Sequence, residues 1–230
     1  MKGLQIWQAH LEALSAAQME KLDALLDPAE RARAARFHFA ADRKHYIASH
    51  GLLRHLLSTI SGKPPPTLVI EYGAHGKPAL TPDAMRPLCF NLSHSAGWAF
   101  FAFAWDGEVG IDLESEARLE RDENTLLGLA TRVLSQRELV IWRTLGDITA
   151  RRAAFLRAWT RKEALAKARG QGLSSDVRQF EVALDAAAPK SSLKIQLPRG
   201  EGEGVGDWIL HDLAAPDGFA AALVVEEKAF

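Results

Sequence analysis

The chain has 230 residues, of which 47% are hydrophobic and 25% charged, a composition typical of a folded globular protein. A formal net charge of −1 excludes a global electrostatic attraction to nucleic acid, and the single cysteine, Cys89, excludes an intrachain disulfide. The longest apolar run, GWAFFAFAW, is too short to cross a bilayer as a helix, and the N-terminus shows no signal-peptide pattern. We therefore expect a cytoplasmic protein without a membrane anchor.

Local signals mark where helices begin and end. In DPAE, Asp27 can cap a helix, Pro28 suits the first helical position and Glu30 can bond back to the cap. The stretch SQRE repeats this capping box, and Gly62 and Gly170 are expected to end two long helices. In chain order, the sequence predicts a strand at 4–7, helical periodicity over 11–25, a helix start at 27–30, a helix over about 40–61 and an extended connector at 63–66. Strands are expected at 68–72, 89–93, 98–105 and 109–114, and helices at about 135–145 and 149–169. Strands then return at 179–184, 193–197, 207–213 and 219–225.

Helices followed by strands thus occur twice along the chain, although no strong sequence repeat accompanies them. This order predicts an α+β fold of two structurally similar halves, packed with pseudo-twofold symmetry and with the active site at their interface. We place the boundary between residues 1–106 and 107–230. The segment 198–206, PRGEGEGVG, fits a flexible hairpin loop.

Two acids stand together in GEVGIDLES, residues 107–115. Val109, Ile111 and Leu113 alternate with polar or small residues, which predicts a strand with one apolar face. The opposite face then carries Asp112 and Glu114. A solvent-facing edge strand would explain these acids as well as a functional site would.

A row of side chains recurs every fourth residue in FLRAWTRKEALAKA. Phe155, Trp159, Glu163 and Lys167 lie along one face of the predicted helix. Because the first two favour burial, the row is expected to face inward and to bring Glu163 and Lys167 to a polar pocket. The alternative is an ordinary surface ion pair between these two residues.

Other polar and basic residues could bind an anion. In FNLSHSAGW, Ser93 and His94 end an apolar strand in a tight polar turn, and HGKPAL holds Lys77 in a rigid turn with Pro78. Each of these features is also common in purely structural contexts. A basic helical segment adds four further cations, which are Arg33, Arg36, Arg43 and Lys44.

Taken together, the order of basic helix, GKP, NLSH, GIDLE and WTRKEALAK resembles the 4′-phosphopantetheinyl transferases, in particular the two-domain type that activates carrier proteins of peptide and polyketide synthases. The resemblance covers nearly the whole chain. GIDLE and WTRKEALAK, about fifty residues apart, are its most specific parts.

The resemblance implies a reaction and a metal. Coenzyme A would donate its phosphopantetheine arm to a serine of an apo acyl or peptidyl carrier protein of fatty acid, polyketide or nonribosomal peptide synthesis, and adenosine 3′,5′-bisphosphate would leave. Asp112, Glu114 and Glu163 would hold Mg²⁺, with Mn²⁺ as a substitute, since hard cations take oxygen ligands. Glu163 would take the serine proton, either as a free carboxylate or through a metal-bound water.

The match also implies a coenzyme A site in which Lys167 and Lys77 contact phosphate oxygens, Lys167 stabilises the leaving group, and Arg33 holds the nucleotide's phosphate. The implied site comprises Arg33, Arg36, Lys77, Pro78, Ser93, His94 and Lys167. Some members of the family carry a lysine where this chain has Glu30.

Two other functions would use the same residues. One is a different metal-dependent phosphoester hydrolase, and the other is a non-catalytic module that binds coenzyme A or a carrier protein. For the transferase, we expect carrier docking in the C-terminal half, where leucines and arginines mix over 121–139. We predict a monomer, because one chain builds a whole site between its own halves, and no nucleic-acid or membrane partner.

Overall fold

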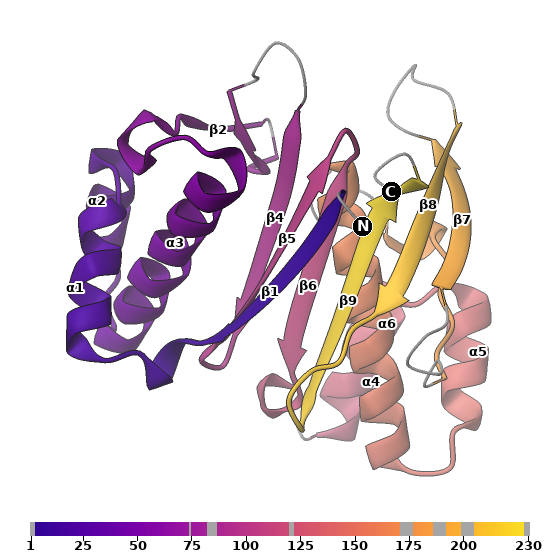
Figure 1. The fold of residues 1–230 in the computed structure, drawn as a ribbon. Helices are drawn as coiled ribbons and strands as arrows, with labels where there is room; N and C mark the ends of the chain where they lie inside the picture. Colours follow the sequence, from indigo (N-terminus) through magenta and orange to yellow (C-terminus); the bar gives the residue numbers. More distant parts are fainter. Residues whose placement is uncertain are drawn as a thin grey trace.

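The computed structural model describes residues 3–73, 75–81, 87–119, 122–170, 177–185, 192–198 and 205–227. These residues form the predicted α+β fold of two halves that lie side by side (Figure 1). We name the elements from β1 to β5 the N-terminal half and those from β6 to β9 the C-terminal half. No helix of the described residues is long and apolar enough to cross a membrane.

Three helices and a small sheet make the N-terminal half. β1 lies at the edge of an antiparallel sheet of order β1-β5-β4, and it extends the predicted strand at 4–7 to His10. β2 and β3 form a separate hairpin. The elements are β1 (Leu4–His10), α1 (Ala16–Leu25), α2 (Pro28–Ala34), α3 (Ala40–Ser61), β2 (Ile70–Tyr72), β3 (Pro78–Leu80), β4 (Leu88–Ser95) and β5 (Trp98–Trp105).

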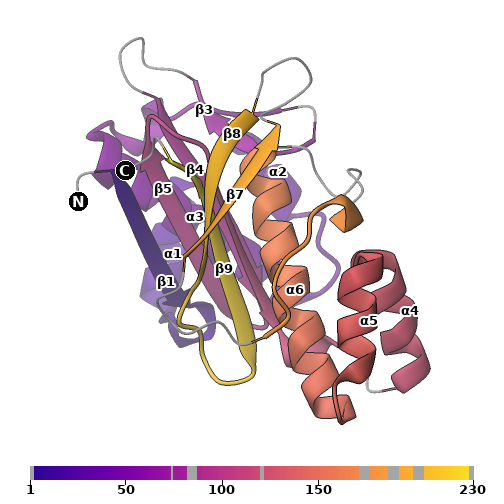
Figure 2. The ribbon, with the colours of Figure 1, turned by 90° about the vertical axis from the view of Figure 1, so that its right-hand side faces the viewer.

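The C-terminal half repeats this plan with a four-stranded antiparallel sheet of order β6-β9-β8-β7. Its helices pack on one face of this sheet (Figure 2), the face opposite the core that the two sheets share. The elements are β6 (Val109–Ser115), α4 (Glu123–Val133), α5 (Gln136–Thr144), α6 (Ile148–Arg169), β7 (Ser192–Pro198), β8 (Val205–Asp212) and β9 (Phe219–Glu226).

The two sheets share a buried core, because alternate residues of one strand point to opposite faces. On β5, Phe101 and Phe103 pack toward α3, whereas Phe100 joins the core between the sheets. On β9, Leu223 joins that central core and Val224 packs toward the C-terminal helices. This arrangement brings β4 of one half beside β6 of the other.

The local helix signals are confirmed. Asp27 and Ser135 each form a capping box, and α3 and α6 end at Gly62 and Gly170 in the left-handed conformation. Because capping depends on residues within one turn, these boundaries could be read from short stretches of sequence.

Four details of the prediction differ from the structure, and the first is that helix α4 (Glu123–Val133) was not predicted. The predicted strand at 179–184 is wrong: the segment begins with a 3₁₀ turn, Val177–Gln179, and continues without a strand. The connector at 63–66 runs into another 3₁₀ turn, Pro65–Thr67, and the short strand β3 was not predicted. In the predicted hairpin loop, residues 199–204 lie outside the described residues.

A buried ion pair ties α2 to α3. Glu30, the capping-box acid of α2, accepts a hydrogen bond of 2.5 Å from Arg54 Nε, and Arg54 also donates to Leu68 O beyond the end of α3. Burial alone would raise the pKa of Glu30, but hydrogen bonds from His50, the Asp27 N–H and Arg54 hold it below its usual value. In this chain Glu30 therefore belongs to a buried ion pair that ties α2 to α3.

The C-terminal half contains an equivalent buried ion pair between two helices. Glu138, the capping-box acid of α5, pairs with Lys162 of α6 at 2.8 Å, and both side chains are buried. Lys162 Nζ donates to Val177 O at 2.9 Å and to Phe180 O at 2.5 Å. We call Glu30–Arg54 and Glu138–Lys162 the two clamps, since each fixes a long helix to the preceding helix and to the 3₁₀ turn that follows.

Candidate active site

Asp112 and Glu114 lie on the face of β6 that α6 covers, while Val109, Ile111 and Leu113 point into the core between the sheets. Asp112 is only 2% exposed, and the Glu114 side chain is 23% exposed. The alternative of a solvent-facing edge strand is therefore wrong. Burying two acids beside each other is unfavourable unless other groups compensate, which favours a functional role.

Gly110 sets how closely α6 approaches this strand. A Cβ atom at this position would lie 2.1 Å from Ala164 O and 2.3 Å from Ala168 N, so only glycine fits. The backbone contact places Glu163 and Lys167, which flank these alanines in the sequence, next to the acids of β6.

Lys167 joins the two halves at the centre of the site. Its ammonium group donates to Asp112 Oδ1 at 2.6 Å and to Ser93 Oγ of β4 at 3.0 Å. Ser93 in turn donates to the same Asp112 oxygen at 2.9 Å. The predicted row on α6 is thus confirmed: Phe155 is buried and Lys167 emerges beside Asp112.

Glu114 is held by three neighbours from different elements. Trp159 Nε1 donates to one oxygen at 3.4 Å, Ser95 Oγ donates to the other at 3.4 Å, and Arg118 approaches at 3.8 Å. Burial and the nearby charge of Asp112 raise the pKa of Glu114, and Arg118 partly offsets this shift.

Glu163 is the least compensated acid of the site. It is 8% exposed, and its buried Oε1 has no hydrogen-bond partner, as is also true of Asp112 Oδ2. Burial and the charge of Asp112 raise the pKa of Glu163 to about 7, against the opposing effect of Lys167. Among the described residues, no three His, Cys, Asp or Glu side chains converge closely enough to enclose a metal ion as they stand.

A basic and aromatic cluster lies on α2 and α3 of the N-terminal half. The Arg33 guanidinium lies 5.6 Å from the centre of the Tyr46 ring, which stacks on His50 at 4.0 Å. Burial raises the pKa of Tyr46 to about 12, so its hydroxyl stays protonated. His94, at the end of β4, and Arg36 are exposed.

The structure separates the other predicted cations from this cluster. Arg43 and Lys44 line a groove against α1 instead. Lys77 reaches the end of α6, where its ammonium pairs with Glu108 Oε2 at 2.5 Å and donates to Ala168 O at 2.7 Å, and Pro78 begins β3. Of the two predicted phosphate-binding lysines, only Lys167 therefore contacts an acid of the GIDLE motif.

Sequence reasoning missed Ser95, Tyr46 and His50. The signal for Ser95 was present, because Asn91, Ser93 and Ser95 alternate on one face of β4, and Asn91 Oδ1 accepts the Ile111 N–H at 2.9 Å. Tyr46 and His50 are four residues apart on α3, a spacing that equally fits an ordinary helix core.

Comparison with known proteins places this geometry in context. A model of the 4′-phosphopantetheinyl transferase superfamily matches residues 108–224, and a model described as 4′-phosphopantetheinyl transferase, N-terminal, matches residues 7–105. Both parts of the site therefore lie within matched regions.

Individual relatives carry the same name. The 4′-phosphopantetheinyl transferase HetI of Nostoc sp. is 34% identical over 223 residues, covering 96% of this chain and 87% of that protein. The 4′-phosphopantetheinyl transferase psf-1 of Bacillus pumilus is 31% identical, covering 73% and 67%, and AcpT of Escherichia coli K12 is 37% identical, covering 56% and 58%. The chain is therefore an enzyme of the 4′-phosphopantetheinyl transferase superfamily.

Proposed function

We propose that the protein transfers the 4′-phosphopantetheine arm of coenzyme A to a serine hydroxyl of an apo acyl or peptidyl carrier protein in a Mg²⁺-dependent reaction. The serine oxygen forms a bond to the phosphorus next to the pantetheine arm. The bond from that phosphorus to the bridging oxygen of the diphosphate breaks, and adenosine 3′,5′-bisphosphate leaves. The serine gives up one proton.

The observation that carries this proposal is the pair of buried, unpartnered oxygens beside Lys167. Asp112 Oδ2 and Glu163 Oε1 are hard ligands of the kind that Mg²⁺ takes, usually one or two carboxylates together with phosphates and waters. They fit such an ion without a complete protein cage. Asp112 and Glu163 would hold it, with Glu114 as the third predicted ligand, and the bound ion would offset negative charge on the diphosphate.

The chain's own residues supply the remaining steps. Lys167 is placed to contact the diphosphate and to stabilise charge on the leaving oxygen, while Ser93 orients it. Glu163 accepts the serine proton, directly or through water. Both roles need close spacing, which the glycine contact between β6 and α6 provides.

The nucleotide end of coenzyme A would bind to the N-terminal half. Arg33 and, more peripherally, Arg36 would carry the positive charge for its phosphate, and His94 and Pro78 are the further predicted contacts. Tyr46 adds a protonated hydroxyl that can donate to a phosphate oxygen. This distribution lets one molecule of coenzyme A bridge both halves.

Carrier docking is proposed for the C-terminal half. On α4, Leu126 belongs to the core and can make no surface contact, whereas Leu127 and Leu129 are partly buried. The exposed cations Arg132 and Arg137 complement an acidic carrier surface.

The test is a direct transfer assay. The protein is incubated with coenzyme A, Mg²⁺ and an apo carrier protein, and the carrier is weighed by mass spectrometry. We expect the carrier to gain the mass of one phosphopantetheine, and to gain nothing when the metal is chelated or when its acceptor serine is replaced by alanine. Hydrolysis of coenzyme A without a carrier would instead identify a hydrolase. Transfer at an undiminished rate in chelator would remove the metal from the proposal.

A further inference from the structure

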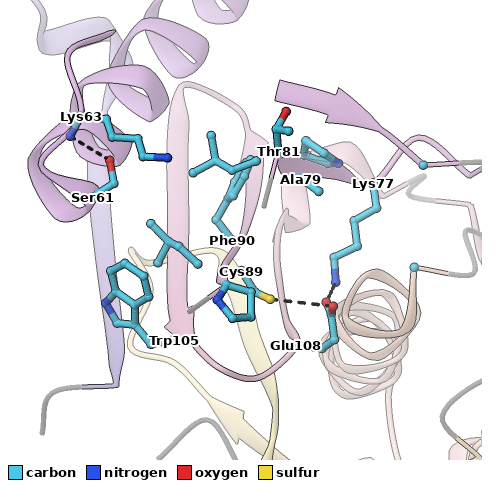
Figure 3. A pocket seen from close by; sticks show the side chains of 15 residues that line it. Ser61, Lys63, Lys77, Ala79, Thr81, Cys89, Phe90, Trp105 and Glu108 are labelled. Carbon is cyan, nitrogen blue, oxygen red and sulfur yellow. Dashed lines mark hydrogen bonds and ion pairs between the residues drawn. The ribbon is translucent and has the colours of Figure 1, made fainter. Parts of the chain in front are cut away.

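A cavity of about 620 Å³ lies between the end of α3, the β2–β3 hairpin and the start of β6 (Figure 3). Its walls include Phe90 and Trp105, and Lys77 crosses one side of it toward Glu108. Lys77 thereby links the N-terminal hairpin to the C-terminal half at a point close to α6.

The contacts of Lys77 are those of a helix cap. The last four carbonyl groups of a helix have no partner within it, and cations near that end are favourable. Ala168 O is one of these carbonyls, and Lys77 Nζ donates to it at 2.7 Å. Glu108 Oε2, 2.5 Å from the same ammonium, balances its charge.

In α6 this cap comes from the other half of the molecule. A Cβ at Gly170 would lie 3.5 Å from Lys77 Cδ, whereas a Cβ at Gly62, the equivalent residue after α3, would meet no atom within 4 Å. The capped last turn of α6 also carries Lys167, because Ala168 follows Lys167 directly. Lys167 itself donates to Ser93, so two lysines fasten this turn across the interface between the halves.

We propose that Lys77 is a positioning residue that caps α6 from the other half and thereby fixes Lys167 against Asp112. This role replaces direct phosphate contact as the main task of Lys77. It rests on the proposed function only where catalysis is measured, since the cap itself can be tested without substrate.

The first test is hydrogen–deuterium exchange of the ligand-free protein. In Lys77→Met, the amides of the last turn of α6 should exchange about tenfold faster, as expected when a partly buried cation at a helix end is lost. Lys77→Arg, which can still reach Ala168 O and Glu108, should restore slow exchange. Lys63→Met is the matched control: this lysine lines the same cavity but lies after α3, and its loss should leave α6 unchanged.

Kinetics then separate positioning from ligand binding. If Lys77 acts through Lys167, Lys77→Met should lower kcat about tenfold or more with little change in KM for coenzyme A. Glu108→Gln should also lower kcat. The double variant Lys77→Met/Glu108→Gln should have a kcat little lower than that of Lys77→Met alone. A raised KM at unchanged kcat, with normal exchange in α6, would overturn the proposal in favour of a phosphate contact. Absence of any transfer by the unaltered protein would refute the proposed function, while the exchange data would still decide whether Lys77 caps α6.

Discussion

The two halves share a framework and differ in chemistry. α3 and α6 are both 22 residues long, and the clamp cation, Arg54 or Lys162, is the fifteenth residue of its helix. Each cation pairs with the capping-box acid of the preceding helix and donates to carbonyls around the next 3₁₀ turn. Equivalent bonds at equivalent positions indicate that the clamps belong to the fold rather than to the reaction.

The residues just beyond the clamps differ. Where α6 carries Glu163 and Lys167, the same positions of α3 hold His55 and Thr59, which are exposed. The fourth residue of the first strand is Asp112 in β6 and Trp7 in β1. The comparison suggests that stability and catalysis occupy adjacent residues of one helix and can be altered separately.

The largest effect should come from Glu163→Gln in α6, which is compared with a separate variant at the equivalent position of α3. Glu163→Gln keeps the size of the side chain and removes its charge, so transfer should fall by about 10²- to 10⁴-fold. His55→Gln, at the matching position of α3, should leave transfer within about twofold. Both are measured as kcat/KM with an apo carrier protein. Comparable losses in the two variants would show that the halves share the chemistry.

The second prediction breaks each clamp. Lys162→Met and Arg54→Met each leave a buried carboxylate without its cation, which should lower the free energy of unfolding by about 3–5 kcal/mol. Denaturant unfolding measures both variants. Arg137→Met, which removes the exposed partner of Glu181, is the control and should change stability by less than about 1 kcal/mol. If only one clamp variant is destabilised, the clamps are not equivalent.

The third prediction concerns pH and metal-free protein. The pKa of Glu163 rises from 4.5 to about 7 on folding, so the stability linked to its protonation is complete below pH 4.5 and is lost as the pH rises through 7. In chelator at pH 8, Glu163→Gln should therefore be more stable than the unaltered protein by on the order of 2 kcal/mol, and equal to it near pH 4. Thermal unfolding at several pH values tests this. His55→Gln should retain the original pH profile, and an unchanged profile in Glu163→Gln would assign the pH dependence to other groups.

The parts of the fold that were predictable depend on local interactions. Capping side chains act within one helical turn, so the end of α3 at Gly62 and the start of α5 after Ser135 could be read directly. The strand at 98–105 was found in full because its apolar run and flanking turn residues are contiguous.

Long-range bonds explain the errors. At 179–184, Phe180, Val182 and Leu184 alternate like a strand and are buried. However, Arg157 donates to Leu184 O, and Glu138 accepts the Val182 N–H, so side chains replace the partner strand that the pattern suggested. Likewise, the motifs at 112–114 and 163–167 identified residues that the structure brings together, but no local pattern shows that Lys77 reaches α6.

Gly110 has a consequence for attempts to redesign this enzyme. The separation between the acid strand and the lysine helix is set by main-chain atoms in contact, so neighbouring side chains can change in volume without altering it. A mutant library that varies the surrounding residues should retain the spacing, whereas one that varies position 110 should accept glycine alone. The most sensitive position in such a library would thus be a residue that has no side chain with which to touch a substrate.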